Sequence, residues 1–395
     1  MSVLWLTRFP PYPPLYGGAF QYSRELLESL CRQTPVQALA YQDATVQIPA
    51  GQPITWHTLP YSRPSRLRGV LSDLPDVAFR FRSRAYLAKA VELARTSGAV
   101  IVDFIAMAWI VAPLKRAMNA AGLDVPLVMI THNHERSLRR AAARSFAFPK
   151  NLVIGYDAWK AGRLELAANA AADLVTAIID EDAHAFANEC DTPGLVLRPG
   201  YRGPVAPTRR IDADTPRMAT IIGNRESAHK LLVLEHALKA LSRHGTDARV
   251  SIEIAGAGDL AALAARHPDC TFRGFVEDMP GYLHGARLGL VPDDLGGGFK
   301  MRVLTLAMLR VPILGLRSAM TGTTFVDGVH YHGVDTLDEM AAVVPTLIDD
   351  TARLDTLQNT AFAYCRDNFD WDKRGEQLMA ALSSTARREA RRMRA

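Results

Sequence analysis

Short runs of apolar residues alternate along the chain with longer amphipathic stretches. Runs typical of buried strands occupy residues 3–7, 36–41, 54–59, 99–106, 126–132 and 173–179. In the amphipathic stretch that includes Tyr86, Ala90 and Ala94, apolar residues recur at helical spacing. Strands that alternate with helices in this way predict βαβ units and a parallel sheet.

A break follows at residues 198–216, which hold four prolines and two glycines and show no apolar period. The alternation then restarts, with helices expected at about 231–243 and near 300–310. Further strands are expected at residues 218–222, 250–256, 270–275, 286–292, 311–316 and 329–333. The pattern predicts two α/β domains in tandem. Ligands of open parallel sheets bind at the carboxyl ends of the strands, so two such sheets facing one another predict an interdomain cleft as the substrate site.

Composition narrows the class of protein. The chain has 395 residues, of which 48% are hydrophobic and 22% are charged, as in an ordinary globular protein. Its net charge is +5, and the last nine residues alone carry +4, so a general nucleic-acid binder is not expected. Four widely spaced cysteines and the absence of a signal-peptide pattern favour a soluble protein of a reducing, cytoplasmic compartment. The longest apolar stretch, Ala99–Leu114, is interrupted by Asp103 and is too short to span a bilayer.

The stretch 286–314 carries the clearest chemical signal. A buried strand is followed by Gly296, Gly297 and Gly298, and then by a helix with Lys300 and Arg302 in its expected first turn. Glycines allow close approach of the backbone, and a helix amino terminus favours anions. Two cations are unfavourable at that end of a helix unless an anion lies nearby. The pattern indicates a phosphate or diphosphate site, although a flexible glycine loop before a surface helix remains the alternative.

Residues 274–314 resemble the nucleotide-sugar site of the retaining family 4 of GT-B glycosyltransferases. Similar segments occur in the family's order along nearly the whole chain. They are the opening 3–30, THNHERSLRR at 131–140, the strand and helix at 164–186, RPGY at 198–201 and NFDWDKRGEQL at 368–378. The resemblance implies two Rossmann-like domains of GT-B architecture. It implies an amino-terminal acceptor-binding domain at 1–200, completed by a carboxyl-terminal helix at 368–395, and a nucleotide-sugar-binding domain at 201–367.

The resemblance also implies roles for individual residues. Catalytic roles fall on His132, beside the reacting sugar carbon, and on Arg225 and Lys230, which match the family's phosphate-clamping pair. His134 and Glu135 are expected to contact the acceptor or to orient an imidazole. Donor contacts are expected from Gly17, Gly18, Gly223, Phe275, Val276, Gly297, Gly298, Phe299, Lys300, Arg302 and Thr305.

Two departures from the family pattern bear on the chemistry. Thr305 stands where the family has a glutamate that holds the ribose, and an extra residue precedes Arg225. Asp212-Ala213-Asp214 has the Asp-x-Asp form of metal-dependent glycosyltransferases but lies in the proline-rich linker, so fixed cations rather than a metal are expected to stabilise the leaving diphosphate. No cofactor is expected beyond the nucleotide-sugar co-substrate.

The predicted function is therefore metal-independent, retaining transfer of a sugar from a nucleotide-sugar donor to a glycan, lipid-linked or other hydroxyl acceptor. A catalytically silent subunit that binds a partner glycosyltransferase and a sugar-nucleotide epimerase of the same fold remain alternatives. A Rossmann dehydrogenase is disfavoured because no G-x-G-x-x-G follows any expected strand.

Two other patterns in the sequence bear on a membrane contact and on a metal site. The basic and apolar segment 63–84 could form a peripheral contact with the inner face of a membrane, which a lipid-linked acceptor would favour. A zinc site is disfavoured because the pairs His132 with His134 and His330 with His332 lie about 200 residues apart.

Overall fold

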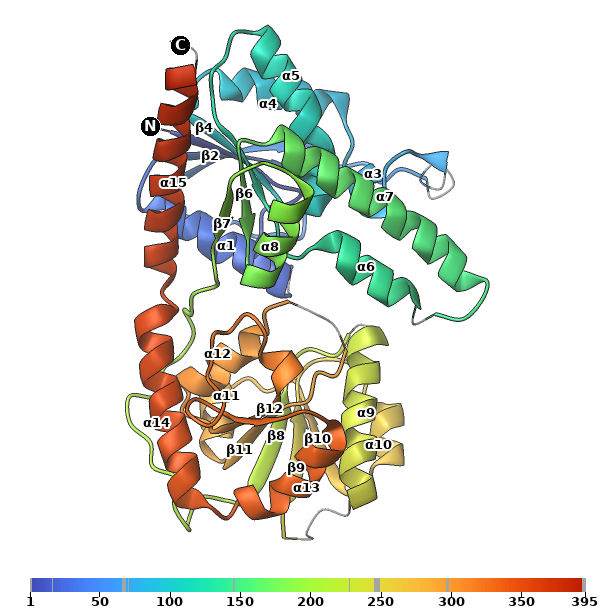
Figure 1. The fold of residues 1–395 in the computed structure, drawn as a ribbon, viewed down its shortest axis with the longest axis vertical. Helices are drawn as coiled ribbons and strands as arrows, with labels where there is room; N and C mark the ends of the chain where they lie inside the picture. The colour runs from blue at the N-terminus through green and yellow to red at the C-terminus, as the bar shows by residue number, and fades with distance from the viewer. Residues whose placement is uncertain are drawn as a thin grey trace. The chain divides into compact units, whose positions relative to one another are not determined.

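The computed structural model describes residues 2–15, 17–65, 69, 71–144, 146–226, 228–244, 249–295 and 298–392. The chain forms two compact units. Unit 1 comprises Met1–Gly200 and Trp371–Ala395, and unit 2 comprises Tyr201–Asp370 (Figure 1). Each unit is an α/β domain with its own apolar core.

Unit 1 contains a seven-stranded sheet in the order β3-β2-β1-β4-β5-β6-β7, in which all paired strands are parallel. The strands are β1 (Val3–Leu6), β2 (Val36–Tyr41), β3 (Ile54–Leu59), β4 (Ala99–Asp103), β5 (Leu127–Ile130), β6 (Leu174–Ala177) and β7 (Gly194–Val196). The helices are α1 (Gly18–Cys31), α3 (Asp76–Phe79), α4 (Arg84–Ala94), the 3₁₀ helix η1 (Ile105–Ile110), α5 (Val111–Ala120), α6 (Glu135–Arg144), α7 (Lys150–Ala171), α8 (Asp180–Glu189) and α15 (Trp371–Arg392).

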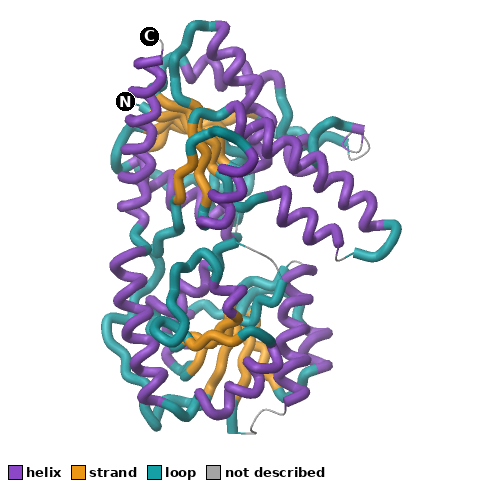
Figure 2. Tube along the Cα trace, in the orientation of Figure 1, coloured by secondary structure: helices purple, strands orange, loops and turns teal. Residues whose placement is uncertain are grey.

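The central strands of unit 1 are buried along their whole length because helices cover both faces of the sheet (Figure 2). The direction of strand order reverses at β1 and β4, so the carboxyl ends of these two strands form the topological switch point. The expected strand 99–106 is three residues shorter than predicted. Phe104 has a φ of 75°, which is incompatible with a strand, and η1 follows directly.

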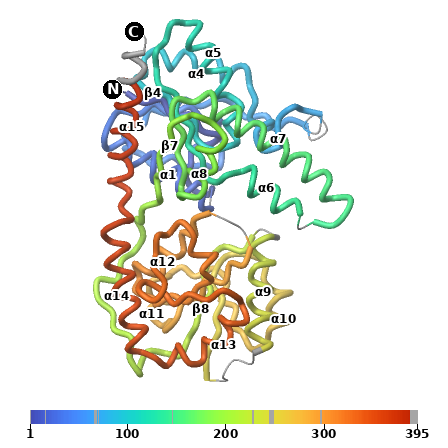
Figure 3. The backbone as a smooth tube through the Cα atoms, in the orientation of Figure 1, coloured from blue at the N-terminus to red at the C-terminus, as the bar shows by residue number. Residues whose placement is uncertain are grey.

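The last helix completes unit 1 by packing on α1 (Figure 3). A glycine is required where the two helices meet, because a Cβ at Gly375 would lie 2.7 Å from the carbonyl oxygen of Ser29. The Gly375 N–H donates to the Ser29 hydroxyl at 3.0 Å, and that hydroxyl donates to the Trp371 carbonyl. The carboxyl-terminal segment is thereby fixed to the first helix of the chain.

Unit 2 contains a six-stranded sheet in the order β10-β9-β8-β11-β12-β13, again with all paired strands parallel. The strands are β8 (Met218–Ile222), β9 (Ser251–Ala255), β10 (Cys270–Gly274), β11 (Leu288–Val291), β12 (Ile313–Leu316) and β13 (His332–Val334). The helices are α9 (Ala228–His244), α10 (Ala261–Arg266), α11 (Met279–His284), α12 (Met301–Met308), the 3₁₀ helix η2 (Arg317–Met320), α13 (Leu337–Leu347) and α14 (Thr351–Asn368). Its switch point lies between β8 and β11.

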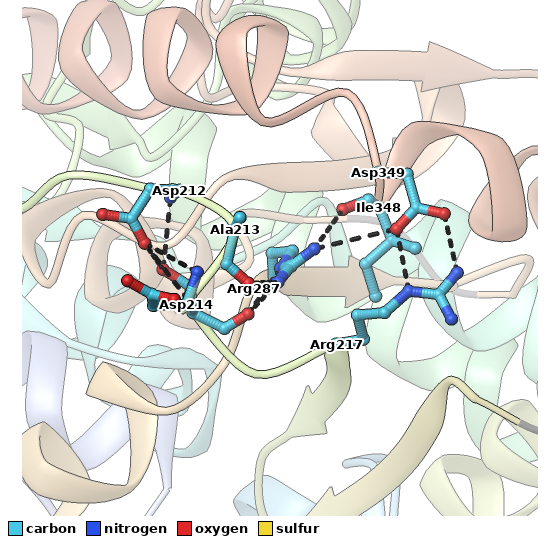
Figure 4. A network of polar contacts seen from close by, with 8 residues as sticks. Asp212, Ala213, Asp214, Arg217, Arg287, Ile348 and Asp349 are labelled. Carbon is cyan, nitrogen blue, oxygen red and sulfur yellow. Dashed lines mark hydrogen bonds and ion pairs between the residues drawn. The ribbon is translucent and has the colours of Figure 1, made fainter.

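A polar network ties the linker to the amino ends of the strands in unit 2 (Figure 4). Arg287, which is 4% exposed, donates to the carbonyls of Ala213 at 3.0 Å and Ile348 at 3.3 Å. An Asp212 carboxylate oxygen accepts the N–H of Asp214 at 3.2 Å. The Asp-x-Asp sequence therefore forms a turn at the edge of the sheet opposite to the carboxyl ends of its strands.

None of the described helices combines the length and the apolar character needed to cross a membrane.

Candidate active site

The turns that follow β8 and β9 pack closely against each other at the carboxyl edge of unit 2. Gly223 has a φ of 130° and Gly256 a φ of 147°. A Cβ at Gly256 would overlap the Gly223 carbonyl oxygen, so both positions require glycine. The Arg225 N–H donates to the Ala257 carbonyl at 2.7 Å. These contacts fix the backbone from which the Arg225 side chain extends.

Arg225 is a buried cation without a counterion among the described residues. Only 2% of the residue is exposed, and burial lowers its pKa to about 10. Its side chain makes one hydrogen bond within the described chain, a long one of 3.4 Å to the Ile222 carbonyl, and its buried Nε has no acceptor there. Because a buried charge is costly unless it is paired, this geometry favours an anionic ligand.

Arg302 lies beside Arg225, in the first turn of α12. Burial and then the positive charge of Arg225 lower the pKa of Arg302 to about 9. Asp293, at the end of β11, forms an ion pair with Arg302. The same two guanidinium groups, after burial, also lower the pKa of Lys230. We refer to Arg225, Lys230 and Arg302 as the cation cluster; Asp293 offsets part of its charge.

Lys300 is the amino-terminal cap residue of α12, which begins at Met301. It therefore lies one position before the helix and not in its first turn, where the sequence suggested it. Its ammonium group donates to the Gly298 carbonyl at 2.9 Å, and burial lowers its pKa to about 8. Gly298 has a φ of 78°, in the left-handed region. The amino terminus of α12 and the side chain of Lys300 thus lie at the same end of the sheet as the cation cluster.

The remaining expected donor residues differ in their surroundings. The hydroxyl of Thr305 hydrogen-bonds Tyr201, whose pKa is nonetheless raised to about 12 by burial. Phe275 is 78% exposed, whereas Val276 packs on the core and the ring of Phe299 lies 5.7 Å from that of Phe369. Gly297 lies outside the described residues. In unit 1, a Cβ added to either Gly17 or Gly18 would meet no atom within 4 Å, so the backbone here borders open space.

A second polar site lies at the switch point of unit 1. Asp103, at the end of β4, accepts hydrogen bonds from the Thr7 hydroxyl at 3.2 Å and from His132 Nε2 at 3.0 Å. His132 follows β5 and is only 6% exposed, with the rings of Tyr22 and Phe104 each 5.0 Å from its own. Its buried Nδ1 has no hydrogen-bond partner among the described residues. With Nε2–H donated to Asp103, a neutral His132 carries its lone pair on Nδ1.

The sequence suggested Glu135 as a residue that contacts the acceptor or orients an imidazole. In the structure, a carboxylate beside His134 belongs to Glu189. His134 Nε2 lies 3.3 Å from Glu189, and its Nδ1 lies 2.7 Å from the Ser137 hydroxyl. Glu135 instead pairs with Arg139 at 2.5 Å, because the two residues are four apart on α6.

Glu165 supplies a buried carboxylate below α6. It accepts the N–H groups of Glu135 at 2.7 Å and Arg136 at 3.0 Å and so satisfies the helix amino terminus. Burial raises its pKa to about 8, even though these two hydrogen bonds act in the opposite direction.

Several residues of the two sites were not singled out from the sequence. Asp103 carried a usable signal, since a charged residue that interrupts an apolar run must be paired if it is buried. Asp293 directly follows the expected strand 286–292, but nothing in the sequence distinguishes it from the neighbouring Asp294. The φ of Phe104 and the pairing of Glu189 with His134 depend on tertiary structure and had no local signal.

Comparison with known proteins gives a family match for unit 2. Residues 217–350, about a third of the chain, match the family described as Glycosyl transferases group 1. No curated protein sequence matches the chain.

Solved structures give matches over almost the full length. HepE from Anabaena, in complex with UDP and glucose, matches 97% of this chain and 100% of its own, with a TM-score of 0.66 and 17% identity. Sucrose-phosphate synthase from Thermosynechococcus elongatus matches 97% of this chain and 98% of its own, with a TM-score of 0.71 and 13% identity. WaaG, a glycosyltransferase involved in lipopolysaccharide biosynthesis, matches 96% of this chain and 99% of its own, with a TM-score of 0.61 and 13% identity. At these identities the matches concern the fold, and they confirm the predicted GT-B architecture with its two parallel α/β sheets.

Proposed function

We propose that the chain is a glycosyltransferase of group 1, which the match of residues 217–350 supports, and that it takes its sugar from a nucleotide-sugar donor with retention of anomeric configuration and without a metal ion. The acceptor is the hydroxyl group of a glycan or of a lipid-linked molecule. The observation that supports a metal-free mechanism is Arg225, a buried guanidinium with no counterion among the described residues, beside Arg302 and Lys230.

The cation cluster suits the charge that develops during transfer. Cleavage of the bond between sugar and phosphate leaves a nucleoside diphosphate, so negative charge accumulates on the oxygen that departs. Fixed guanidinium groups and a helix amino terminus stabilise such charge without reorganising. Arg225 and Lys230 contact the diphosphate, and Lys300 adds its charge at the start of α12. Asp293 competes with the diphosphate for Arg302 and releases it when donor binds.

His132 acts on the sugar in this proposal. Its Nδ1 lone pair accepts a hydrogen bond from a sugar hydroxyl, and Asp103 holds the ring and its tautomer through Nε2. Asp103 is itself fixed by Thr7. His132 is a catalytic residue here, and Asp103 is a positioning residue.

Uridine nucleotides are the first donors to test. HepE was crystallised with UDP-glucose, and a trehalose-6-phosphate protein from E. coli was bound with UDP-2-fluoro glucose. A thermal-shift panel of UDP-, GDP-, ADP- and dTDP-sugars identifies the base, since a ligand at 100 times its Kd stabilises the folded state by about 2.7 kcal/mol. No stabilisation by any of them, in a folded sample, would refute the transferase proposal and favour a silent, partner-binding subunit.

The second candidate function is a catalytically silent subunit that binds a partner glycosyltransferase. Thr305 favours it, because this residue replaces the glutamate expected to hold the ribose. If Thr305 serves the ribose as a neutral, shorter group, Thr305→Glu should bind nucleoside diphosphate as well as wild type or better. A Thr305→Val control, which cannot accept a hydrogen bond, should bind more weakly. Unchanged affinity in both variants would place the ribose away from α12.

For a membrane contact, the structure favours a different segment from the one expected at 63–84. Phe81 in that segment is 7% exposed, and Arg82 is paired with Asp73 at 3.0 Å. Residues 66–68 and 70 of the segment 63–84 lie outside the described residues. Six exposed apolar side chains gather in the first half of α7 and in the segment before it. They are Phe146, Phe148, Leu152, Val153, Tyr156 and Trp159.

Basic residues accompany this apolar surface, so we propose that it contacts anionic lipid. Lys150 and Arg163 lie on the rings of Phe146 and Trp159 at 4.7 and 4.8 Å. Sedimentation with phosphatidylglycerol vesicles should fall in the variant Phe148→Ser/Leu152→Ser and should remain in the control Leu71→Ser, whose side chain is also exposed. Equal sedimentation of the two variants would refute this contact.

A further inference from the structure

Unit 1 contains a cavity of about 280 Å³ that is lined by three arginines. One follows β1, one follows β3 and one is the carboxyl-terminal cap residue of α3. The arginines are Arg8, Arg63 and Arg80, and the walls include Phe9, Tyr61 and Phe81. Pockets for whole small-molecule ligands measure about 300–1,000 Å³. The cavity is therefore suited to one group of a larger ligand. None of its residues belongs to the donor or catalytic residues proposed above.

Arg8 is the most constrained of the three arginines. Its guanidinium is held between two aromatic rings, 4.0 Å from the centre of Phe20 and 4.2 Å from that of Phe104. Burial lowers its pKa to about 10, and the negative charge of Asp103 acts against this effect. The stacking fixes the plane of the guanidinium but satisfies none of its N–H groups.

No acceptor within the described chain takes a hydrogen bond from the Arg8 side chain. Asp103 is the carboxylate that acts on it, but the Asp103 oxygens are already engaged by the Thr7 hydroxyl and by His132 Nε2. Arg8 thus has five N–H donors in a fixed plane, partly buried and on the wall of the cavity. An anionic group of a ligand in the cavity can accept charge-assisted hydrogen bonds from these donors.

The rest of the cavity is also positive. Arg63 and Arg80 both lower the pKa of Tyr61, which burial raises, so their charges lie near its hydroxyl. Arg80 is paired with Asp76, which leaves an excess of guanidinium groups over carboxylates on the cavity wall. Edge-to-face contacts of Phe9 with Tyr61 at 5.1 Å and with Phe81 at 5.5 Å make that wall rigid.

We infer that this cavity binds an anionic group of the acceptor, a phosphate or a carboxylate, with Arg8 as the residue that recognises it. The inference rests on the proposed transferase function, because it assigns the charge to the acceptor. Arg8 directly follows Thr7, which holds the Asp103 that positions His132. An anion on Arg8 therefore anchors the acceptor at the same edge of the sheet as the catalytic histidine.

The test measures binding of two probes, inorganic phosphate and acetate, to the full chain by calorimetry. Saturating UDP occupies the phosphate contacts of unit 2, so that the probes cannot bind there. If UDP does not bind, the measurement uses Lys300→Ala instead to weaken these contacts. Arg8→Gln should weaken binding of the preferred probe at least tenfold, the loss of one charge-assisted pair. Arg8→Lys should recover part of it, and Arg82→Gln, whose side chain pairs with Asp73 outside the cavity wall, should leave it unchanged.

The outcomes separate the two proposals. Stronger binding of phosphate identifies a phosphorylated acceptor, and stronger binding of acetate identifies a carboxylated one. Anion binding that Arg8→Gln leaves unchanged, or the absence of binding, overturns the inference even if UDP binds well. Arg8-dependent anion binding in a protein that binds none of the UDP-, GDP-, ADP- and dTDP-sugars overturns the transferase proposal and leaves the anion site. The melting temperature of Arg8→Gln and its affinity for UDP show whether the variant is folded.

Discussion

The charge of Lys300 should make nucleoside diphosphate binding depend on pH in the alkaline range. Burial lowers the pKa of this lysine from 10.5 to about 8. The sign follows directly, because the ammonium form binds the diphosphate and is lost as pH rises through 8. With that pKa, about nine-tenths of Lys300 is charged at pH 7 and about one-tenth at pH 9. The dissociation constant for UDP should therefore rise by about tenfold between pH 7 and pH 9.

Calorimetry of UDP binding at pH 7, 8 and 9 measures this slope, with Lys300→Arg as the matched control. Arginine keeps its charge to higher pH than lysine, so the variant should give the shallower profile, which retains only the titration of other groups near the diphosphate, such as Arg302 and Lys230. Any titration of the nucleotide itself is common to both proteins and cancels in their ratio. Parallel profiles for the two proteins would refute a contact between Lys300 and the diphosphate.

Three further predictions concern other residues and the metal. His132→Ala should lower kcat by about two orders of magnitude with little change in donor KM. Asp103→Asn should lower kcat and shift the pH profile of kcat. Wild-type turnover in His132→Ala would contradict the catalytic role of His132. Transfer activity should survive excess EDTA, and a loss that Mg²⁺ or Mn²⁺ restores would contradict the metal-free mechanism. The folded-state pKa of Glu165, about 8, lies above its unfolded value, so this residue should lower stability as pH rises from about 4.5 to 8. Urea unfolding of Glu165→Gln should show a flatter profile across that range, and an unchanged profile would mean that Glu165 does not titrate there.

Much of the fold was predictable because burial leaves a pattern in the sequence. Helices cover both faces of the sheets, so strands such as β5 and β11 are apolar throughout and stand out from amphipathic helices. The exact ends were less predictable: β4 ends where Phe104 adopts a positive φ, which no local pattern encodes for a phenylalanine. Lys300 falls just before α12 rather than within it, a difference of one residue.

The candidate site was predictable where chemistry follows a strand along the chain. Lys300 and Arg302 follow β11 and its glycines, and His132 follows β5. Partners that come from distant segments were not predictable, since Asp103 reaches His132 from 29 residues away and Glu189 reaches His134 from farther still. Arg8 directly follows the first apolar run of the sequence, and its lack of an acceptor among the described residues is visible only in three dimensions.

The difference in affinity between UDP and uridine tests the central claim most directly, because it isolates what the diphosphate contributes. Calorimetry on wild type and on Arg225→Gln gives this difference for each protein. The cation cluster predicts that wild type binds UDP at least a hundredfold more tightly than uridine, and that Arg225→Gln loses most of this preference while its affinity for uridine is unchanged. Equal affinities in wild type for the nucleoside diphosphate and the nucleoside of the base that the thermal-shift panel selects, or a preference that Arg225→Gln leaves intact, would contradict the account.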